Sequence, residues 1–314
     1  MSTAGARAGR LLGAAVVAGT AVLGWSLVEA RSPVLRRVQV PVLGPGEAPL
    51  RLLHLSDLHL GPRSTAERDW VAGLAALEPD LTVVTGDMLA HRDAVATVVC
   101  ALGDLLHRPG AFVLGSNDYY APSVRSPLRY FFGPSRIDRP VVDLPTGDLV
   151  SSLTGAGWLD LTNTRGRLEV AGRTVRLVGV DDPHIRRDRM PAPQSRARQG
   201  RDGGDLRLGV THAPYRRVLD AMADDGSALV LAGHTHGGQV CVPGHGALVT
   251  NCDLPTAYAK GLFAWASSVP VGDGFASPAS SWVHVSAGVG TSPYTPVRLA
   301  CRPEATLLTL VPRP

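Results

Sequence analysis

Aromatic residues are scarce in this chain, at 5% of 314 residues, and no segment combines clustered basic residues with interleaved aromatics. Nucleic-acid surfaces depend on such stripes, because bases stack on aromatic rings while Lys and Arg contact phosphates. We therefore expect no nucleic-acid partner. The net charge of +4 is small and fits an anionic substrate or an anionic membrane surface.

Cysteine is also rare, and the four cysteines show no C-x-x-C spacing, which argues against a zinc site built from thiolates. Cys241 and Cys252 flank a Pro-Gly-His-Gly turn, so they could face each other across a hairpin. Buried, reduced thiols are the alternative. The sequence leaves open whether Cys241, Cys252 or Cys301 forms a disulfide.

One segment lacks charge altogether. The run from Leu11 to Val28 is, at about 1.5 Å per residue in a helix, roughly 27 Å long, which matches the hydrocarbon core of a bilayer. We expect residues 1–35 to be a single membrane-spanning anchor with its linker, which would place the protein at the cell membrane. Arginines flank the run on both sides, so the side of the membrane is not determined. A cleaved signal peptide is the alternative, because Val28-Glu29-Ala30 resembles a cleavage site, and it would make the protein secreted or extracytoplasmic.

The rest of the chain alternates short apolar runs with helical patterns. The apolar runs, typical of strands buried on both faces, are Leu50–Leu55, Leu81–Thr85, Ala111–Leu114, Val175–Val180, Leu206–Val210 and Ala228–Ala232. Helices are expected at Thr65–Leu77 and Asp93–Leu106. The pattern predicts an α/β fold for one domain over residues 49–314. The segments Ala121–Leu149, rich in Pro, and Arg186–Arg207, rich in Arg, are expected to be irregular surface loops.

Asp and His residues follow several of these predicted strands. Asp57 and His59 come after the first strand, and Asp87 follows a glycine after the second. His234 and His236 repeat the spacing of two in a glycine-rich turn. Because ligands of α/β sheets gather at the carboxyl ends of strands, we expect these side chains to converge. Carboxylates and imidazoles in this combination suit a pair of divalent metal ions.

The order of these motifs resembles the five sequence blocks of the calcineurin-like metallophosphoesterase superfamily, D-x-H, G-D, G-N-[HRC]-[DE], H and G-H-x-H. The corresponding segments are Asp57-Leu58-His59, Gly86-Asp87, Gly115-Ser116-Asn117-Asp118, His212 and Gly233-His234-Thr235-His236. The continuation to Gly237-Gly238-Gln239 is similar to the bacterial membrane-associated branch, which includes phosphodiesterases similar to UDP-2,3-diacylglucosamine pyrophosphohydrolases. As a set, the blocks are highly specific.

The resemblance implies a four-layer αββα sandwich, in which two mixed β-sheets pack together between helices. It also implies a dinuclear metal centre. The ligands of the first ion would be Asp57, His59 and His236, those of the second His212, His234 and a residue of the Gly115–Asp118 turn, and Asp87 would bridge the two. The ions, roughly 3.5–4 Å apart, would activate a shared water to hydroxide for attack on phosphorus. Mn²⁺, Fe²⁺ and Zn²⁺ all suit such ligands, and we expect Mn²⁺ to be the best activator in vitro.

One block departs from the family pattern. Without a gap, Ser116 occupies the place of the metal-binding Asn, and Asn117 that of the His that helps to expel the leaving group. If the turn slips by one residue, Asn117 is the ligand, which we favour because an amide oxygen is a better donor to a hard cation than a hydroxyl. In both alignments the usual imidazole is missing, so leaving groups of low pKa are the predicted preference. The predicted catalytic residues are Asp87, Asn117 and Asp118.

These features predict a metal-dependent hydrolase of phosphoesters or pyrophosphates, acting as a phosphodiesterase on a membrane-proximal or nucleotide-linked lipid. The alternative among enzymes is a phosphomonoesterase or a phosphodiesterase of soluble nucleotides. The alternative outside enzymes is a metal-binding scaffold that has lost catalysis. His184 could contact a substrate phosphate, whereas His54, on the first strand, is expected to be a core residue.

Overall fold

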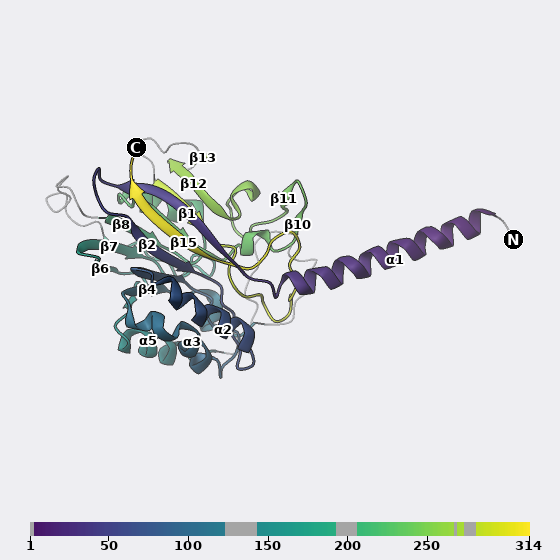
Figure 1. Ribbon diagram of the computed structural model, residues 1–314, viewed down its shortest axis with the longest axis horizontal. Helices are drawn as coiled ribbons and strands as arrows, with labels where there is room; N and C mark the ends of the chain where they lie inside the picture. Colours follow the sequence, from purple (N-terminus) through teal and green to yellow (C-terminus); the bar gives the residue numbers. More distant parts are fainter. Residues whose placement is uncertain (1–2, 123–142, 193–205, 267–268, 273–280) are drawn as a thin grey trace.

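Two β-sheets form the centre of the protein in this computed structural model, which describes residues 3–122, 143–192, 206–266, 269–272 and 281–314 (Figure 1). The first sheet contains, in spatial order, β1 (Val34–Leu43), β15 (Glu304–Pro312), β2 (Leu50–Leu55), β3 (Leu81–Thr85), β4 (Gly110–Val113) and β5 (Leu159–Asp160). The second contains β13 (Val269–Gly272), β12 (Gly261–Ala266), β14 (Ser281–Val285), β9 (Leu229–Ala232), β8 (Leu206–Val210), β7 (Arg173–Gly179) and β6 (Arg165–Val170). A short hairpin pairs β10 (Cys241–Val242) with β11 (Gly246–Ala247).

Both sheets are mixed. In the first, β2, β3 and β4 are parallel, whereas β15 is antiparallel to β2. In the second, β7, β8, β9 and β14 are parallel, and β6 and β12 are antiparallel to their neighbours. Parallel strands have their carboxyl ends at the same edge, so the turns that follow β2, β3 and β4 lie together, as do those that follow β8 and β9.

Three helices pack on the outer face of the first sheet and one on that of the second. The helices of the described residues are α1 (Thr3–Glu29), α2 (Thr65–Gly73), α3 (Val95–Leu102), α4 (Ser116–Tyr119), α5 (Thr146–Gly155) and α6 (Arg216–Asp224), with 3₁₀ turns η1 (Leu74–Leu77), η2 (Gly103–His107), η5 (His236–Gly238) and η6 (Thr256–Tyr258). Buried side chains of α2, α3 and α5 pack with those of β2 and β3 in one hydrophobic cluster. Those of α6 pack with β9, β12 and β14 in another.

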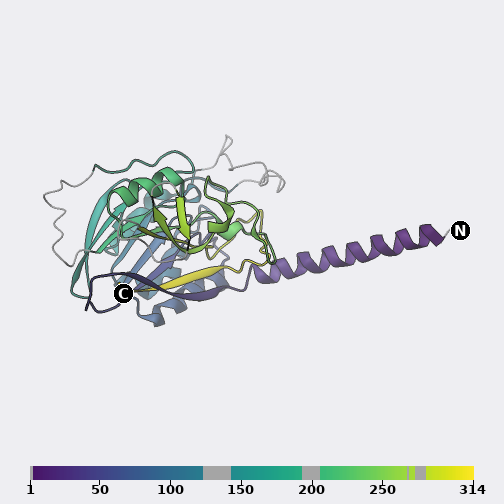
Figure 2. The ribbon, with the colours of Figure 1, turned by 90° about the horizontal axis from the view of Figure 1, so that it is seen from above.

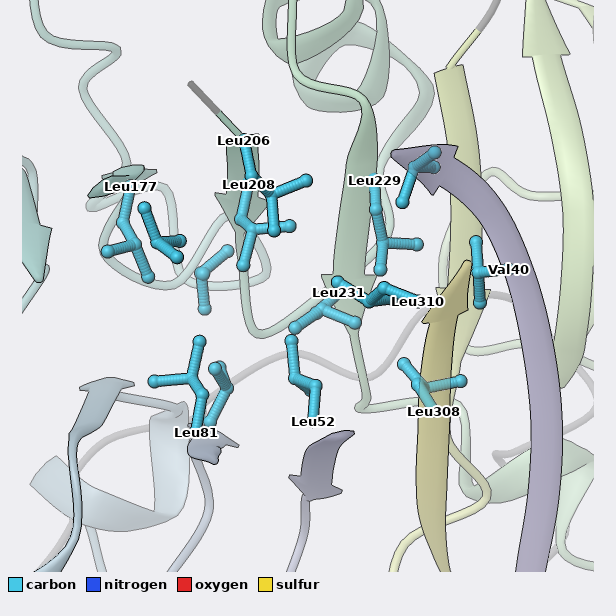
Figure 3. Close-up of a cluster of buried hydrophobic side chains, with 14 of the residues drawn as sticks. Val40, Leu52, Leu81, Leu177, Leu206, Leu208, Leu229, Leu231, Leu308 and Leu310 are labelled. Atoms are coloured by element: carbon cyan, nitrogen blue, oxygen red, sulfur yellow. The ribbon is translucent and has the colours of Figure 1, made fainter. Parts of the chain in front are cut away.

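A third hydrophobic cluster joins the two sheets. Leu52 and Leu81 of the first sheet point toward Leu208 and Leu231 of the second, and all four are fully or almost fully buried (Figure 3). Burying a leucine side chain stabilises the fold by about 1.5–3 kcal/mol, so this layer is a main source of stability. The order of layers is therefore helix, sheet, sheet, helix, as the family resemblance implies.

The predicted strands and helices are mostly confirmed. All six apolar runs form strands, and each predicted helix is an α-helix continued by a 3₁₀ turn, α2 by η1 and α3 by η2. The predicted loops are wrong at their ends, because Thr146 already begins α5 and Leu206 begins β8. Residues 123–142 and 193–205 of those loops lie outside the described residues.

The expected start of the domain at residue 49 is too late. Strand β1, before that residue, pairs in parallel with β15 from Val34 to Leu43 and so belongs to the first sheet. Its partner is the last strand of the chain, about 270 residues away, as the pairing of Val34 with Glu304 shows. A pairing over such a distance leaves no local sequence signal, which is why the strand was not recognised.

The N-terminal segment forms a helix that projects from the body of the protein (Figures 1 and 2). Its last turn packs on the body: Ser26 and Glu29 are buried, whereas apolar side chains such as Val17 and Leu23 are exposed. In the described part of the chain, no helix combines the length and the apolar character that crossing a membrane requires. The predicted membrane-spanning helix is therefore not supported.

A glycine on β4 offers a test of the packing of the first sheet. A Cβ atom at Gly110 would overlap the indole ring of Trp158, whose Nε1 donates a hydrogen bond to Arg108 O at 3.1 Å. We expect Gly110→Ala to destabilise the protein by about 1–3 kcal/mol through overpacking. The matched change Gly155→Ala, where no atom lies within 4 Å, should be neutral or stabilising by up to about 1 kcal/mol. Urea unfolding measures both, and equal effects would contradict this packing.

Candidate metal centre

Polar side chains from both sheets meet where the parallel strands end. The first sheet contributes Asp57 and His59 after β2 and Asp87 after β3, and the second contributes His212 after β8 and His234 and His236 after β9. Two groups of these residues have ligand atoms within 4.8 Å of one another and are candidates to hold a metal ion: Asp57, His59 and His236, and Asp57, Asp87 and His212.

The backbone at these positions is unusual. Non-glycine residues with left-handed φ angles include Asp57 (50°), His59 (43°), Asp87 (53°), His234 (69°) and His236 (48°). Each such residue costs about 1–3 kcal/mol, and strain of this kind clusters at functional sites. Asp and His tolerate this region better than bulky residues do, which fits their use here. The strained turns direct the side chains of successive strand ends toward a common point.

Two glycines allow these side chains to approach the backbone. A Cβ atom at Gly233 would overlap the side chains of Ser56 and Asp57. A Cβ atom at Gly115 would overlap the carboxylate of Asp87. The glycines of two sequence motifs are therefore required sterically, because they leave room for the two carboxylates.

The distances within the cluster are short. Nε2 of His59 lies 3.6 Å from Oδ2 of Asp87, and Nε2 of His212 lies 3.5 Å from Oδ1 of the same carboxylate. Asp87 thus lies between imidazoles from the two sheets. On the other side, Nε2 of His236 is 3.6 Å from Oδ1 of Asp57 and 3.2 Å from Nε2 of His59.

In two of the histidines, one ring nitrogen is held by a backbone carbonyl oxygen. Nδ1 of His212 is 2.7 Å from Thr85 O and donates to it, while its buried Nε2, 3.5 Å from Asp87, has no hydrogen-bond partner among the described residues. Nε2 of His234 is 3.2 Å from Asn251 O, which leaves Nδ1 as its other nitrogen. A backbone acceptor on one ring nitrogen is the usual way to orient a metal-ligating histidine. The donor set and the Nε2 of His212 therefore fit a divalent cation.

The electrostatics point the same way. Burial lowers the pKa of His212, but the carboxylates of Asp87, Asp182 and Asp57 outweigh it and raise this pKa to about 10. Burial lowers the pKa of His236 well below its usual value, and Arg298 lowers it further. The raised pKa of His212 shows that the buried carboxylates favour a positive charge beside them, as a metal ion would supply. The lowered pKa of His236 keeps its imidazole neutral, which is the form that binds metal ions.

Comparison with known proteins identifies the family. The family model of the calcineurin-like phosphoesterases matches residues 50–238, which is more than half of the chain. The chain belongs to this family. Its members are hydrolases that act on phosphoester bonds, and the match ends at the last glycines of the histidine-rich turn.

Three relatives extend the comparison. The chain is 29% identical to a transmembrane protein with metallophosphoesterase domain from Bos taurus, over 91% of this chain and 59% of that protein, and 30% identical to one from Danio rerio, over 70% and 49%. It is 29% identical to the phosphodiesterase YaeI of Escherichia coli (strain K12), over 84% of this chain and 83% of that protein. The chain thus spans only about half the length of the two animal relatives.

The turn that departs from the family pattern lies directly on Asp87. The Asn117 backbone N–H donates to Oδ1 of Asp87 and its Nδ2 to Oδ2, both at 2.7 Å. Asp118 is buried, and its carboxylate accepts hydrogen bonds from the backbone N–H groups of Met88, Leu89 and Gly115. The side chain of the turn that contacts the Asp87 carboxylate is therefore that of Asn117, and Asp118 holds the turn in place.

Sequence reasoning missed Arg298. Its side chain is fully buried and donates hydrogen bonds to the carbonyl oxygens of His236, Gly288 and Gly290 at 3.1, 3.3 and 2.7 Å. Its Nη2 also lies 3.1 Å from Nδ1 of His236. A guanidinium can only donate, so this last contact requires the tautomer with the proton on Nε2 and would end if Nε2 bound a metal ion. The carbonyl contacts do not depend on the tautomer.

Two further histidines and the four cysteines belong to neither of the two candidate ligand groups. His54 is buried between the sheets and contacts His284 and Thr85, as expected for a core residue. The ring of His184 packs against His234 with centroids 4.3 Å apart, so it lies beside the predicted ligands. All four cysteines are free, and β10 pairs Cys241 with Ala247 rather than with another cysteine.

The two alignments of the turn predict different metal binding. If Asn117 is a ligand of the second ion, Asn117→Ala should weaken the binding of that ion by about tenfold or more and slow the hydrolysis of every substrate. The matched change Ser116→Ala should leave both unchanged. Elemental analysis after gel filtration, with Mn²⁺ titration, measures the outcome. Two ions bound to Asn117→Ala with unchanged affinity, or a loss in Ser116→Ala, would reverse the assignment.

Proposed function

We propose that this protein is a metal-dependent phosphodiesterase that hydrolyses phosphoester or pyrophosphate bonds at a dinuclear centre. The observation that supports this most directly is the convergence of the buried carboxylates of Asp57 and Asp87 with imidazoles from both sheets, together with the Nε2 of His212, which has no hydrogen-bond partner among the described residues. The similarity to a named phosphodiesterase over most of both chains supports the reaction class.

The ligands divide between two cations. We assign Asp57, His59 and His236 to the first, His212, His234 and Asn117 to the second, and Asp87 to both, with Mn²⁺ as the expected activator. Two bound divalent cations supply electrostatic stabilisation of the transferring phosphoryl group and a nucleophile at neutral pH. Asp118 serves the reaction indirectly, because its carboxylate is engaged by three backbone N–H groups and positions the turn.

The leaving group should have a low pKa. The turn at Gly115–Asp118 contains no imidazole in either alignment, so it lacks the acid that would protonate a departing alkoxide. His184 lies beside His234, and its Nδ1 is 3.2 Å from the hydroxyl of Tyr215. From this position we expect His184 to contact a phosphate oxygen of the substrate. Anhydrides and aryl diesters are accordingly the proposed substrate chemistry.

The substrate is proposed to lie near a membrane. Helix α1 ends next to the metal centre, because Ser26 O accepts a hydrogen bond from the backbone of Arg298, the residue that holds the His236 turn. Glu29 accepts two more from the backbone N–H groups of Ala300 and Cys301. The exposed apolar side chains of α1 and the animal relatives named as transmembrane proteins support association of this helix with lipid. A phosphate group of a membrane lipid would then be within the reach of the centre.

Removal of the bridging charge tests the reaction. Asp87→Asn should lower the rate with Mn²⁺ and bis(p-nitrophenyl) phosphate by at least about a hundredfold, since a carboxylate shared by two cations is lost, while the fold is kept. Chelation of the metal should have the same effect and should be reversed by Mn²⁺. The exposed Asp69→Asn on α2 is the matched control and should retain full activity. Turnover by Asp87→Asn at the wild-type rate would exclude the proposed centre. A wild-type protein that hydrolyses neither diesters nor anhydrides would instead indicate a metal-binding scaffold that has lost catalysis.

Membrane association predicts a second outcome. Val17 and Leu23 are 70% and 55% exposed on α1, and aspartate at both positions should reduce sedimentation of the full chain with phospholipid vesicles by at least about tenfold. Leu248→Asp, at a position 39% exposed on the body, is the control and should sediment as the wild type does. Sedimentation that does not change in the α1 variant would contradict the role of this helix.

A further inference from the structure

Three arginines lie in a row across neighbouring strands of the second sheet. Arg167 on β6 pairs with Arg176 on β7, which pairs with Arg207 on β8. They lie on the outer face, because side chains alternate along a strand and the flanking Leu177 and Leu208 belong to the core between the sheets. Like charges directly opposite one another destabilise a sheet, so this row has a cost that a bound anion would offset.

The charges of this row are only partly balanced. Within the described residues, the side chains of Arg167 and Arg207 make no hydrogen bond or ion pair, whereas Arg176 has a partner of its own. Asp225, whose carboxylate lies beside this row, is already engaged, since it forms two hydrogen bonds of 2.7 Å with the guanidinium of Arg165. Because Asp225 is paired with Arg165, it does not neutralise Arg167 and Arg207, and their positive charge is available to bind an anion.

These residues line a cavity of about 240 Å³. Val178 contributes an apolar part of its wall, and Ser227, in the turn after α6, contributes a hydroxyl. Ser227 is only 4% exposed, and its Oγ has no hydrogen-bond partner within the described residues. Leaving a buried hydroxyl unpaired costs about 1–3 kcal/mol, so such a group calls for a ligand or a water. The cavity thus presents two guanidinium groups and a hydroxyl donor.

We propose that this cavity binds a small phosphate-bearing ligand at a second site, separate from the metal centre. Guanidinium forks match phosphate oxygens in geometry and charge, and a serine hydroxyl adds a third donor. The cavity is smaller than the roughly 300–1,000 Å³ of pockets for drug-sized ligands, which favours a pyrophosphate or a sugar phosphate over a nucleotide. Strands β6 and β7 lie on the side of the body away from α1, which favours a soluble ligand over a lipid headgroup (Figures 1 and 2).

Titration of the full chain with pyrophosphate tests the proposal. A chelator in the buffer keeps pyrophosphate from binding through metal ions at the catalytic centre and from being hydrolysed there. Because hydrogen bonds to charged groups contribute about 1.5–3 kcal/mol each, the double variant Arg167→Gln with Arg207→Gln should bind at least about tenfold more weakly. Ser227→Ala should bind about three- to tenfold more weakly. Hydrolysis of bis(p-nitrophenyl) phosphate with Mn²⁺ should be unchanged in both, which separates this site from the metal centre.

The matched control is Arg37→Gln, an exposed arginine on β1 at the far edge of the first sheet. It should bind pyrophosphate as the wild type does. If Arg37→Gln and the double variant lost equal affinity, the loss would come from the change in overall charge, and the proposal would be wrong. Unchanged binding of pyrophosphate in the double variant would also overturn it. If the wild type bound only vesicles that carry anionic phospholipid, and the double variant did not, the ligand of this site would be the phosphate of a lipid headgroup. Binding of neither probe by the wild type would exclude the site.

Discussion

The carboxylates of Asp57 and Asp87 are buried close together, and most features of the centre compensate for the cost of burying them. An unpaired buried charge costs several kcal/mol, so each carboxylate needs donors or cations around it. Backbone N–H groups of His234 and Asn117 donate to them, and imidazoles from both sheets surround them. A pair of divalent cations would complete this balance, which makes metal binding the function that the site best supports.

Assembly of the centre depends on the packing of the two sheets. The carboxylates come from the first sheet, whereas His212, His234 and His236 come from the second, so neither sheet contains the site alone. The leucine-rich layer between the sheets holds the two sets of strand ends at a fixed separation (Figure 3). Changes in that layer would therefore alter the distances between ligands even without contact with them, because packed interiors transmit small shifts.

A similar dependence links the N-terminal helix to the centre. Glu29 and Ser26, at the end of α1, hold the backbone of residues 298–301, and Arg298 in turn holds the turn that carries His236. The helix is thus part of the support of one candidate ligand and not only an extension of the chain. If α1 binds a lipid surface as proposed, these contacts would hold the candidate metal centre close to that surface.

Much of the fold and of the candidate site could be predicted from short stretches of the sequence. Short apolar runs marked six strands, and the spacing of Asp57, His59, Asp87, His234 and His236 at strand ends indicated where they would meet, since parallel strands share an edge. Gly86, before Asp87, and the Asp and His residues themselves also fit left-handed turns. These signals are local because each depends on a few neighbouring residues and on the period of a strand.

Contacts between distant segments were decided only by the tertiary structure. Strand β1 is defined by its pairing with β15, Arg298 by its burial against His236, and the arginine row by the register of β6, β7 and β8. Only the tertiary structure shows that Asn117 is the side chain of the turn that contacts the Asp87 carboxylate. The sequence by itself determined the strands, the motifs and the family; the register, the buried partners and the docking of α1 required the folded chain, because they depend on which surfaces pack together.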